Sequence, residues 1–463
     1  MTASFQSITG IARSHIADSD VSNLGPMHRH KLHALKRISL AAASGNKRDL
    51  RRRIHTYTEA EGVRCLAIIQ AQKGIAGPPD CDGQMCMAEL PHYARKMKFH
   101  SDCGEPIRAW FEPKYAQPAY AQDSDSFAKQ DGGVYLVNQS GHVNGIGAPV
   151  SASTSEPQIV DYRPICSFGI IRRAQQIMVR DILDAIVGNN HLDFNRAGLG
   201  GSAAMDKITS SIATGAFSHV VVGDITNCFG SMKHEGVKAM LPLPGAMIEH
   251  VILLSEDAPI HFAAIPENMS VHVAKRKARQ GIPQGSLVSP LVARTLLDPA
   301  LRDSSLGGEM VVIVDDVLAL ARTDGEAAAI KNTLQHKLEN HPAGPFAMKH
   351  LYIKPISSWF GFLGYRFVGI VTDGHMSVVA APSNKSLAKF ASKLELKALQ
   401  GATDEQIYHA ICDWGRSWNW LMANEHARSD FKNAVYAAIL QSVPDRFEAA
   451  ESALCQVLSK SSI

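Results

Sequence analysis

The stretch that decides the fold is Met310-Val-Val-Ile-Val-Asp315-Asp316-Val-Leu-Ala-Leu-Ala321, in which two adjacent carboxylates separate two apolar runs. Runs of this length and Val content predict buried strands. A carboxylate in such a place must reach solvent or a cation, because an unpaired buried charge is costly. The pattern therefore predicts a tight hairpin with Asp315 and Asp316 at its tip. Aspartate is a common turn residue, so a metal site at this tip needs a third carboxylate from elsewhere in the chain.

The composition is that of an ordinary globular protein. The chain has 463 residues, of which 45% are hydrophobic, and a net charge of +3. This length predicts about two to four subdomains, and the weak charge assigns any nucleic-acid binding to local basic patches. No apolar run approaches a transmembrane span, the first residues lack a signal-peptide pattern, and the eight scattered cysteines do not suggest a disulfide framework. We expect a cytoplasmic protein with no membrane partner.

The N-terminal region is strongly basic between residues 28 and 55. Nine lysines and arginines in this stretch face a single acid, Asp49. Leu32, Leu35 and Ile38 recur at near-helical spacing, which predicts short helices. Their charges form either a solvated face or a surface that contacts phosphates.

Three cysteines, Cys81, Cys86 and Cys103, lie near His92 and His100 in the sequence. Structural zinc sites usually hold paired ligands at CxxC-like spacing, and the spacing here is irregular. The pattern argues against a structural zinc ion without excluding one.

The next region predicts a strand, a loop and a helix. Glu105–Lys114 has the pattern of a strand, and residues 116–158 are small and polar, as is typical of an inserted loop. Order resumes at Tyr162-Arg163-Pro-Ile165, and a broad apolar face predicts a helix from Ile170 to Ile186. Arg163 is either ordinary surface charge or the fork-shaped donor that a triphosphate needs.

A third carboxylate follows another apolar strand, where residues 216–223 lead into Asp224-Ile-Thr-Asn-Cys-Phe229. The segment Arg279-Gln280-Gly-Ile-Pro-Gln284-Gly285-Ser-Leu-Val-Ser289-Pro290 comes next and leads into an apolar helix. Beyond the Asp315–Asp316 hairpin lies Phe362-Leu-Gly-Tyr365. A strand end and a hairpin tip on a neighbouring strand can together bridge a pair of metal ions.

This ordered set resembles the reverse transcriptases of the right-hand polymerase class over about residues 105–370. Asp224-x4-Phe229 looks like their motif A, Gln280 to Pro290 like motif B, Val314-Asp315-Asp316 like motif C and Phe362–Tyr365 like motif E. Tyr162-Arg163-Pro-Ile165, with Arg172 and Gln176, resembles the fingers motif, and Asn195–Ser202 resembles the glycine-bearing segment before motif A. The resemblance implies an α+β fold with fingers, a palm built on an antiparallel sheet and a helical thumb.

The expected divisions follow from this resemblance. A basic helical extension covers residues 1–104, fingers cover 105–215 with an insertion at about 116–158, the palm covers 216–375, and a helical thumb covers 376–463. Within the thumb, Thr403-Asp-Glu-Gln406 predicts a capping box that opens a helix.

The resemblance also implies which groups carry the chemistry. Nucleotidyl transfer uses two cations about 3.5–4 Å apart, here expected to be Mg²⁺, with Mn²⁺ as the alternative, at Asp224, Asp315 and Asp316. Adjacent strand residues point to opposite faces, so Asp224 and Asp315 are expected as the main ligands and Asp316 as a supporting charge. Lys349 is the expected general acid, and Lys354 is the second candidate.

Five further residues are expected to bind the nucleotide. Arg163 and Lys114 would hold the triphosphate, and Gln284 would touch the incoming nucleotide. Gly285 would allow close backbone approach. Phe229 corresponds to the bulky ring under the sugar, which excludes a 2′-hydroxyl and favours deoxynucleotides.

Among reverse transcriptases, the chain looks most like the bacterial retroelement-derived group, which includes retrons, abortive-infection enzymes and defence-associated enzymes. That membership implies an RNA-directed DNA polymerase that uses dNTPs, an RNA template such as a dedicated non-coding RNA, and a DNA product in antiphage defence. Protein-primed or template-independent synthesis by the same site, and a nucleic-acid-binding module with a vestigial site, are the alternatives. A homo-oligomer or a partner protein is left open.

Overall fold

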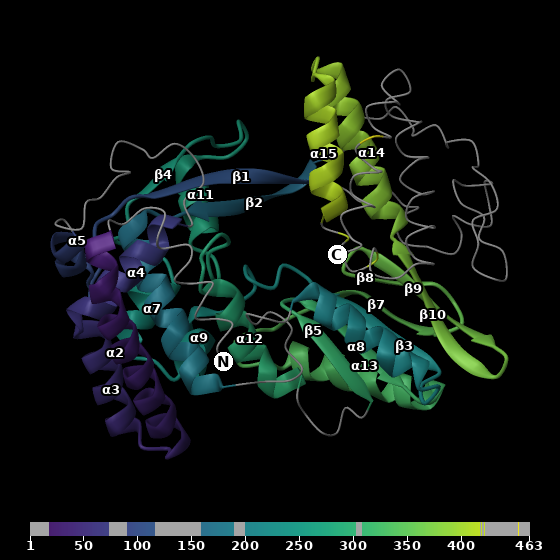
Figure 1. Ribbon diagram of the computed structural model, residues 1–463, viewed down its shortest axis with the longest axis horizontal. Helices are drawn as coiled ribbons and strands as arrows, with labels where there is room; N and C mark the ends of the chain where they lie inside the picture. The colour runs from purple at the N-terminus through teal and green to yellow at the C-terminus, as the bar shows by residue number, and fades with distance from the viewer. Residues whose placement is uncertain are drawn as a thin grey trace.

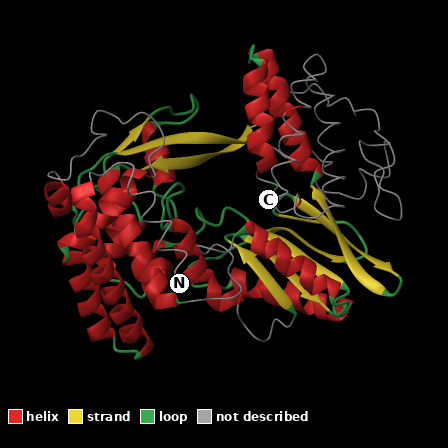
Figure 2. Cartoon of the chain, in the orientation of Figure 1, coloured by secondary structure: helices red, strands yellow, loops and turns green. Residues whose placement is uncertain are grey.

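The computed structural model describes residues 18–73, 90–115, 159–188, 200–301 and 308–416, together with residues 418, 421 and 452. The fold is mixed α+β, as the sequence predicts (Figures 1 and 2). Within these ranges no helix has the length and apolar character needed to cross a membrane. Cys81, Cys86, most of Asn195–Ser202 and the expected insertion at 116–158 lie outside the described residues.

The N-terminal helices pack against the long helix α7 (Ile170–Val187). They are α2 (Asp18–Ala43), α3 (Lys47–Glu59), α4 (Glu61–Lys73) and α5 (Leu90–Lys96). The first of them is a single helix of 26 residues, longer than the short helices expected. Ile38, Ile54 and Tyr57 are buried in the same hydrophobic core as α7, so the basic extension and the following region share one core.

A small sheet lies above α7 in Figure 1. Its strands are β1 (Ile107–Tyr115), β2 (Ile159–Ser167) and β4 (Ile260–Phe262). The pair β1–β2 is antiparallel and forms a long ribbon, whereas β4 runs parallel to β1 on the other edge. Helix α11 (Val271–Ala278) is joined to β2 by an ion pair between Lys277 and Asp161.

The central sheet has the order β5-β6-β3-β7 and is antiparallel throughout. Its strands are β3 (His219–Ile225), β5 (Glu309–Ile313), β6 (Asp316–Ala321) and β7 (Met348–Pro355). Alternate residues enter two different cores, as the two-residue period of a strand requires. Val220, Val222, Leu318 and Leu320 pack with residues of α8 (Gly201–Ala213). Val221, Ala319 and Ala321 pack with α12 (Ser289–Leu301) and α13 (Asp324–Glu339).

The connection between β3 and α12 is largely helical, and its remaining elements are α9 (His234–Met240), the short α10 (Gly245–Met247) and the π-helix η2 (Ile248–Ile252). The buried side chains Val237, Met247 and Ile248 join the same core as α7. This segment therefore ties the small sheet to the central one.

The C-terminal part begins with a third sheet, formed by β8 (Phe360–Phe362), β9 (Tyr365–Thr372) and β10 (His375–Pro382). The prediction that the chain turns helical after residue 375 is wrong for β10, which pairs with β9 along its whole length. Helices α14 (Asn384–Leu399) and α15 (Asp404–Arg416) follow. The capping box is confirmed, because Thr403 and Gln406 exchange side chain-to-backbone hydrogen bonds of 2.9 and 3.3 Å.

Candidate active site

The predicted hairpin exists, and its register brings the carboxylates together. Strands β5 and β6 are joined by a two-residue turn at Val314 and Asp315. Asp316, the first residue of β6, lies directly opposite Asp224 on β3. Directly opposite residues of an antiparallel pair share a face of the sheet, so Asp316 shares the face of Asp224. The two-residue period cannot separate Asp315 from Asp316, because Asp315 lies in the turn, and the lesser role predicted for Asp316 loses its geometric basis.

The hairpin tip is a strained turn. Val314 has a φ of 55°, which is unfavourable for a β-branched residue and is most often retained where a fixed geometry is needed. The backbone carbonyl of Asp315 accepts a hydrogen bond of 3.0 Å from the amide of Ile225, the residue after Asp224. This bond joins the tip of the hairpin to the end of β3. It fixes the two acidic segments against each other.

The three carboxylates are close enough to change one another's charge. Burial raises the pKa of Asp315, and the negative charge of Asp224 raises it further. Burial, together with Asp315 and Asp224, raises the pKa of Asp316 to about 7. Lys349 opposes both shifts, and Arg163 opposes the shift of Asp315. The cluster therefore favours an added positive charge, whether a proton, a lysine or a metal ion.

Lys349 supplies part of that charge. It lies on β7 directly opposite Asp224, and its Nζ is 3.1 Å from Oδ2 of Asp224. The other oxygen, Oδ1, is buried and has no hydrogen-bond partner within the described residues. Lys354, the second candidate for the general acid, instead donates a hydrogen bond of 3.1 Å to the carbonyl of Trp359. The structure thus places Lys349, and not Lys354, among the acidic groups.

The acidic residues fit a divalent cation that binds oxygen. The free Oδ1 of Asp224 and the raised pKa values of Asp315 and Asp316 are what a missing positive charge produces. Over the described ranges, however, no three His, Cys, Asp or Glu side chains form a group that could hold a metal ion. Magnesium keeps several waters and needs only one or two protein carboxylates. The residues therefore fit a hydrated Mg²⁺ better than a closed protein cage.

The glutamine–glycine segment, which runs from Gln280 to Pro290, makes close backbone contacts with the residues that follow β3 on one side and with β2 on the other. The amide of Ile282 donates a hydrogen bond of 2.9 Å to the carbonyl of Phe229, and the amide of Cys166 donates one of 2.8 Å to the carbonyl of Gln284. Gly281 has a φ of 67° and Gly285 one of 98°. The close approach predicted at Gly285 exists, but its partner is the β2 backbone, since a Cβ on this residue would lie 2.1 Å from the Cys166 carbonyl oxygen.

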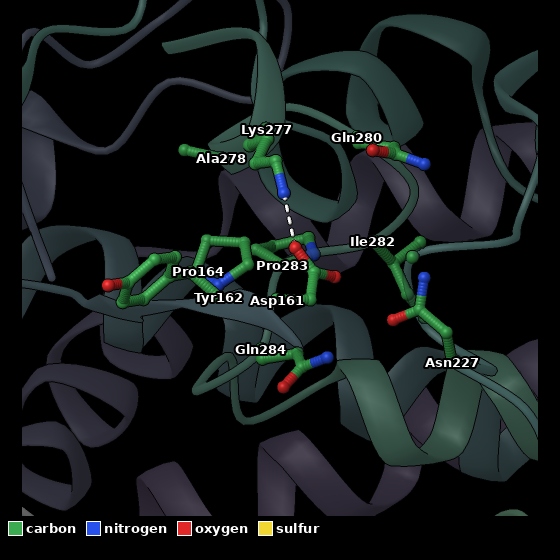
Figure 3. A pocket seen from close by; sticks show the side chains of 11 residues that line it. Asp161, Tyr162, Pro164, Asn227, Lys277, Ala278, Gln280, Ile282, Pro283 and Gln284 are labelled. Atoms are coloured by element: carbon green, nitrogen blue, oxygen red, sulfur yellow. Dashed lines mark hydrogen bonds and ion pairs between the residues drawn. The ribbon is translucent and has the colours of Figure 1, made fainter. Parts of the chain in front are cut away.

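A small open pocket lies beside this segment (Figure 3). Tyr162 and Pro164 of β2 line one side, and Asn227 and Gln280 line the other. Lys277 of α11 points to Asp161, and their ion pair of 2.6 Å closes one wall. Gln284 also lines the pocket, and its side chain is half-buried. Phe229, also half-buried, packs at the edge of the main core and does not line the pocket.

The predicted triphosphate ligands lie on the β1–β2 ribbon. Arg163 is exposed and forms an ion pair of 2.6 Å with Glu112, its cross-strand neighbour. Its positive charge reaches the hairpin tip, since it lowers the pKa of Asp315. Lys114 pairs with Asp161 through the strand register, and its side chain lies outside the described part of the structure.

Two residues of the expected fingers motif, Arg172 and Gln176, are buried and hold neighbouring segments together by hydrogen bonds. Arg172 is 4% exposed, donates two hydrogen bonds of 2.8 Å to Asp102 and donates a third to the carbonyl of Glu105. The Glu105 carboxylate in turn accepts from the first amides of α7. Gln176 accepts a hydrogen bond of 3.2 Å from the amide of Leu287. Sequence reasoning missed these roles, because only the fold shows that Asp102 faces Arg172.

Cys103 lies near this network. It is a half-buried free thiol whose pKa is raised by burial. Cys81 and Cys86, the other two cysteines of this irregular pattern, are outside the described residues, so the prediction against a structural zinc ion is not tested.

Comparison with known proteins gives a structural likeness of low score. No protein-family model and no curated protein matches the chain. Among solved structures, the chain is similar to a telomerase from Candida albicans in complex with a TWJ fragment of telomeric RNA, with a TM-score of 0.32 and 10% identity over 66% of this chain. The chain spans 62% of that telomerase chain. A likeness of this size carries no argument about function, so the interpretation depends on the site itself.

Proposed function

We propose that the chain is an RNA-directed DNA polymerase. One observation carries this proposal: the register of β3 with β6 sets Asp224 opposite Asp316, with Asp315 at the strained tip beside them. Divalent cations at these carboxylates would supply the activation of a 3′-hydroxyl and the neutralisation of a leaving pyrophosphate. The sequence resemblance to reverse transcriptases points to the same chemistry.

The other elements take polymerase roles in this proposal. The central sheet is the palm, the β1–β2 ribbon with α7 forms the fingers, and the helical thumb starts at α14. Arg163 leaves Glu112 to bind the triphosphate, which is a stronger bidentate acceptor than one carboxylate. Gln284 contacts the incoming nucleotide from the wall of the pocket. Lys349 neutralises Asp224 and is positioned to donate a proton to the departing pyrophosphate.

Sugar choice tests the proposal together with the activity. Purified protein with Mg²⁺ should extend a DNA primer on an RNA template with dNTPs and discriminate against NTPs. Phe229→Ala should raise the use of NTPs relative to dNTPs by roughly tenfold or more, because steric discrimination of a group about the size of one methylene is worth about 1–3 kcal/mol. If Phe229→Ala discriminates between dNTPs and NTPs as strongly as the wild-type protein, Phe229 does not select the sugar.

The same assay separates the alternatives. DNA synthesis without added template would indicate template-independent addition, and product that is released from the protein only by protease would indicate protein priming. Tight RNA binding with no incorporation under any of these conditions would mean a vestigial site. A role in antiphage defence with a dedicated non-coding RNA has the sequence resemblance as its support, and sequencing the nucleic acid that co-purifies with the protein tests it.

A further inference from the structure

The helical hairpin of α2 and α3 carries a dense group of exposed positive charges. Lys36 and Arg37 lie in the second half of α2, and Lys47, Arg48 and Arg51 lie in the first two turns of α3. All five side chains are exposed, and residues 44–46 join the two helices. These five residues define the α2–α3 basic face. The two helices that carry it lie on the far side of α7 from the β1–β2 ribbon (Figure 1).

The charges of this face oppose the stability of the helix that holds them. Lys47 and Arg48 stand at the N-terminus of α3, where the helix dipole favours negative charge. Lys47 with Arg51, and Arg48 with Arg52, are like-charged pairs four residues apart, which destabilise a helix. The acid in the first turn, Asp49, pairs with Arg52 and Arg53. Within the described residues, the five side chains of the basic face have no ion pair, so their charge is left for an external anion.

The hairpin holds this face firmly against the rest of the molecule. Ile38 of α2 and Ile54 and Tyr57 of α3 are at most 1% exposed. On α7, Asp181 accepts a hydrogen bond of 3.0 Å from the Tyr57 hydroxyl and forms an ion pair of 2.6 Å with Lys31. The backbone positions that carry the positive charges are thus fixed, so a ligand need order only the side chains when it binds.

We propose that the α2–α3 basic face binds the phosphate backbone of a double-stranded segment of RNA. Paired RNA is recognised mainly by its shape and its phosphates, whereas unpaired bases are held by stacking on aromatic rings. Tyr57, which is the Phe, Tyr or Trp residue of these two helices, is buried. The rings left exposed on them belong to the histidines His30, His33 and His55, and the five residues of the basic face are lysines and arginines, which favour contact with phosphates over base stacking. The choice of RNA over DNA rests on the proposed function, which requires an RNA template.

The test is a binding titration with a fluorescently labelled RNA hairpin over a range of salt concentrations, without nucleotides. Arg48→Gln/Arg51→Gln should weaken binding at least about tenfold and reduce the slope of log affinity against log salt by about 2, since each phosphate contact contributes about 0.9 to that slope. Lys331→Gln/Lys337→Gln on α13 removes the same charge elsewhere and should change the affinity less than about twofold. Lys36→Gln/Arg37→Gln should reproduce the loss from the other helix.

Three outcomes would overturn the proposal. The first is a double variant that binds the RNA hairpin as tightly as the α13 control. The second is a DNA duplex of the same sequence that binds equally well and suffers the same loss. The third is retained RNA binding with lost binding to phosphatidylserine vesicles, which would assign the face to a membrane surface.

The variant on α3, Arg48→Gln/Arg51→Gln, should keep or raise the melting temperature of the protein, because it removes like-charge repulsion. Since no step requires catalysis, a failure of primer extension would overturn the proposed function and leave this result standing.

Discussion

At the scale of single residues, the raised pKa of Asp316 reflects the shortage of positive charge around Asp224, Asp315 and Asp316. Its pKa of about 7 lies above the value of 3.8 expected in an unfolded chain. Between these values the folded state binds more protons than the unfolded state, so stability falls as the pH rises. This loss of folding stability is absent below about pH 4 and complete above about pH 7. A residue that cannot ionise at position 316 should remove the loss.

Asp316→Asn should therefore stabilise the protein in EDTA at pH 8 and have a clearly smaller effect at pH 5, where only part of the cost is present. One pKa unit corresponds to about 1.4 kcal/mol, and solvent screening reduces the total, so we expect a gain of about 1–3 kcal/mol at pH 8. Urea unfolding of both proteins at the two pH values measures it. An equal difference at pH 5 and pH 8 would refute the electrostatic origin.

Lys349 can be tested apart from any proton transfer. The Lys349 ammonium group already neutralises Asp224. Removal of this group should therefore strengthen cation binding and slow catalysis. We expect Lys349→Met to lower the dissociation constant for Mn²⁺, measured by electron paramagnetic resonance, by roughly tenfold, equivalent to about 1.4 kcal/mol. Lys354→Met on the same strand should leave Mn²⁺ binding unchanged. Weaker Mn²⁺ binding in Lys349→Met would mean that the lysine supports the metal site instead.

At the scale of elements, the glutamine–glycine segment depends on two backbone conformations. Gly285→Ala places a Cβ 2.1 Å from the Cys166 carbonyl oxygen, at a residue with a φ of 98°. The oxygen belongs to the backbone and the Cβ is fixed to it, so no side-chain rotation can relieve the clash. We expect a loss of about 2 kcal/mol or more in unfolding free energy. Gly245→Ala, where no atom lies within 4 Å of the added Cβ, is the matched control. Equal unfolding midpoints for the two variants would contradict the close approach.

Strand and helix positions and the β5–β6 hairpin followed from local pattern, whereas pairings between distant segments did not. The apolar runs around Asp315 and before Asp224 predicted their strands correctly, because two-residue periodicity and turn residues are local signals. The register that puts Asp316 opposite Asp224 depends on contacts between distant segments. The same holds for the buried Arg172, because its partner Asp102 lies 70 residues away in the sequence. The strand β10 was missed because its residues His375–Pro382 are stabilised by pairing with β9.

At the scale of the whole molecule, three groups of elements surround the central sheet, whose strand ends carry the acidic residues. The basic N-terminal helices share the core of α7, which in turn contacts the glutamine–glycine segment through Gln176. On its other face, the sheet that carries Asp224 shares one hydrophobic core with α8 and with residues of α14 and α15. A polymerase needs such a common frame, because the template, the nucleotide and the metal ligands must keep their relative positions during transfer.

The most direct test of this account is single-turnover extension of a DNA primer on an RNA template by Asp224→Asn. The substitution keeps the shape of the side chain and removes its negative charge. Asp206→Asn, at an exposed position of α8, is the control. We expect Asp224→Asn to lower the rate at least about 1000-fold, because several kcal/mol of transition-state stabilisation are lost and each 1.4 kcal/mol is about a factor of ten. We expect Asp206→Asn to stay near the wild-type rate. Extension by Asp224→Asn at a rate similar to that of the control would contradict this account.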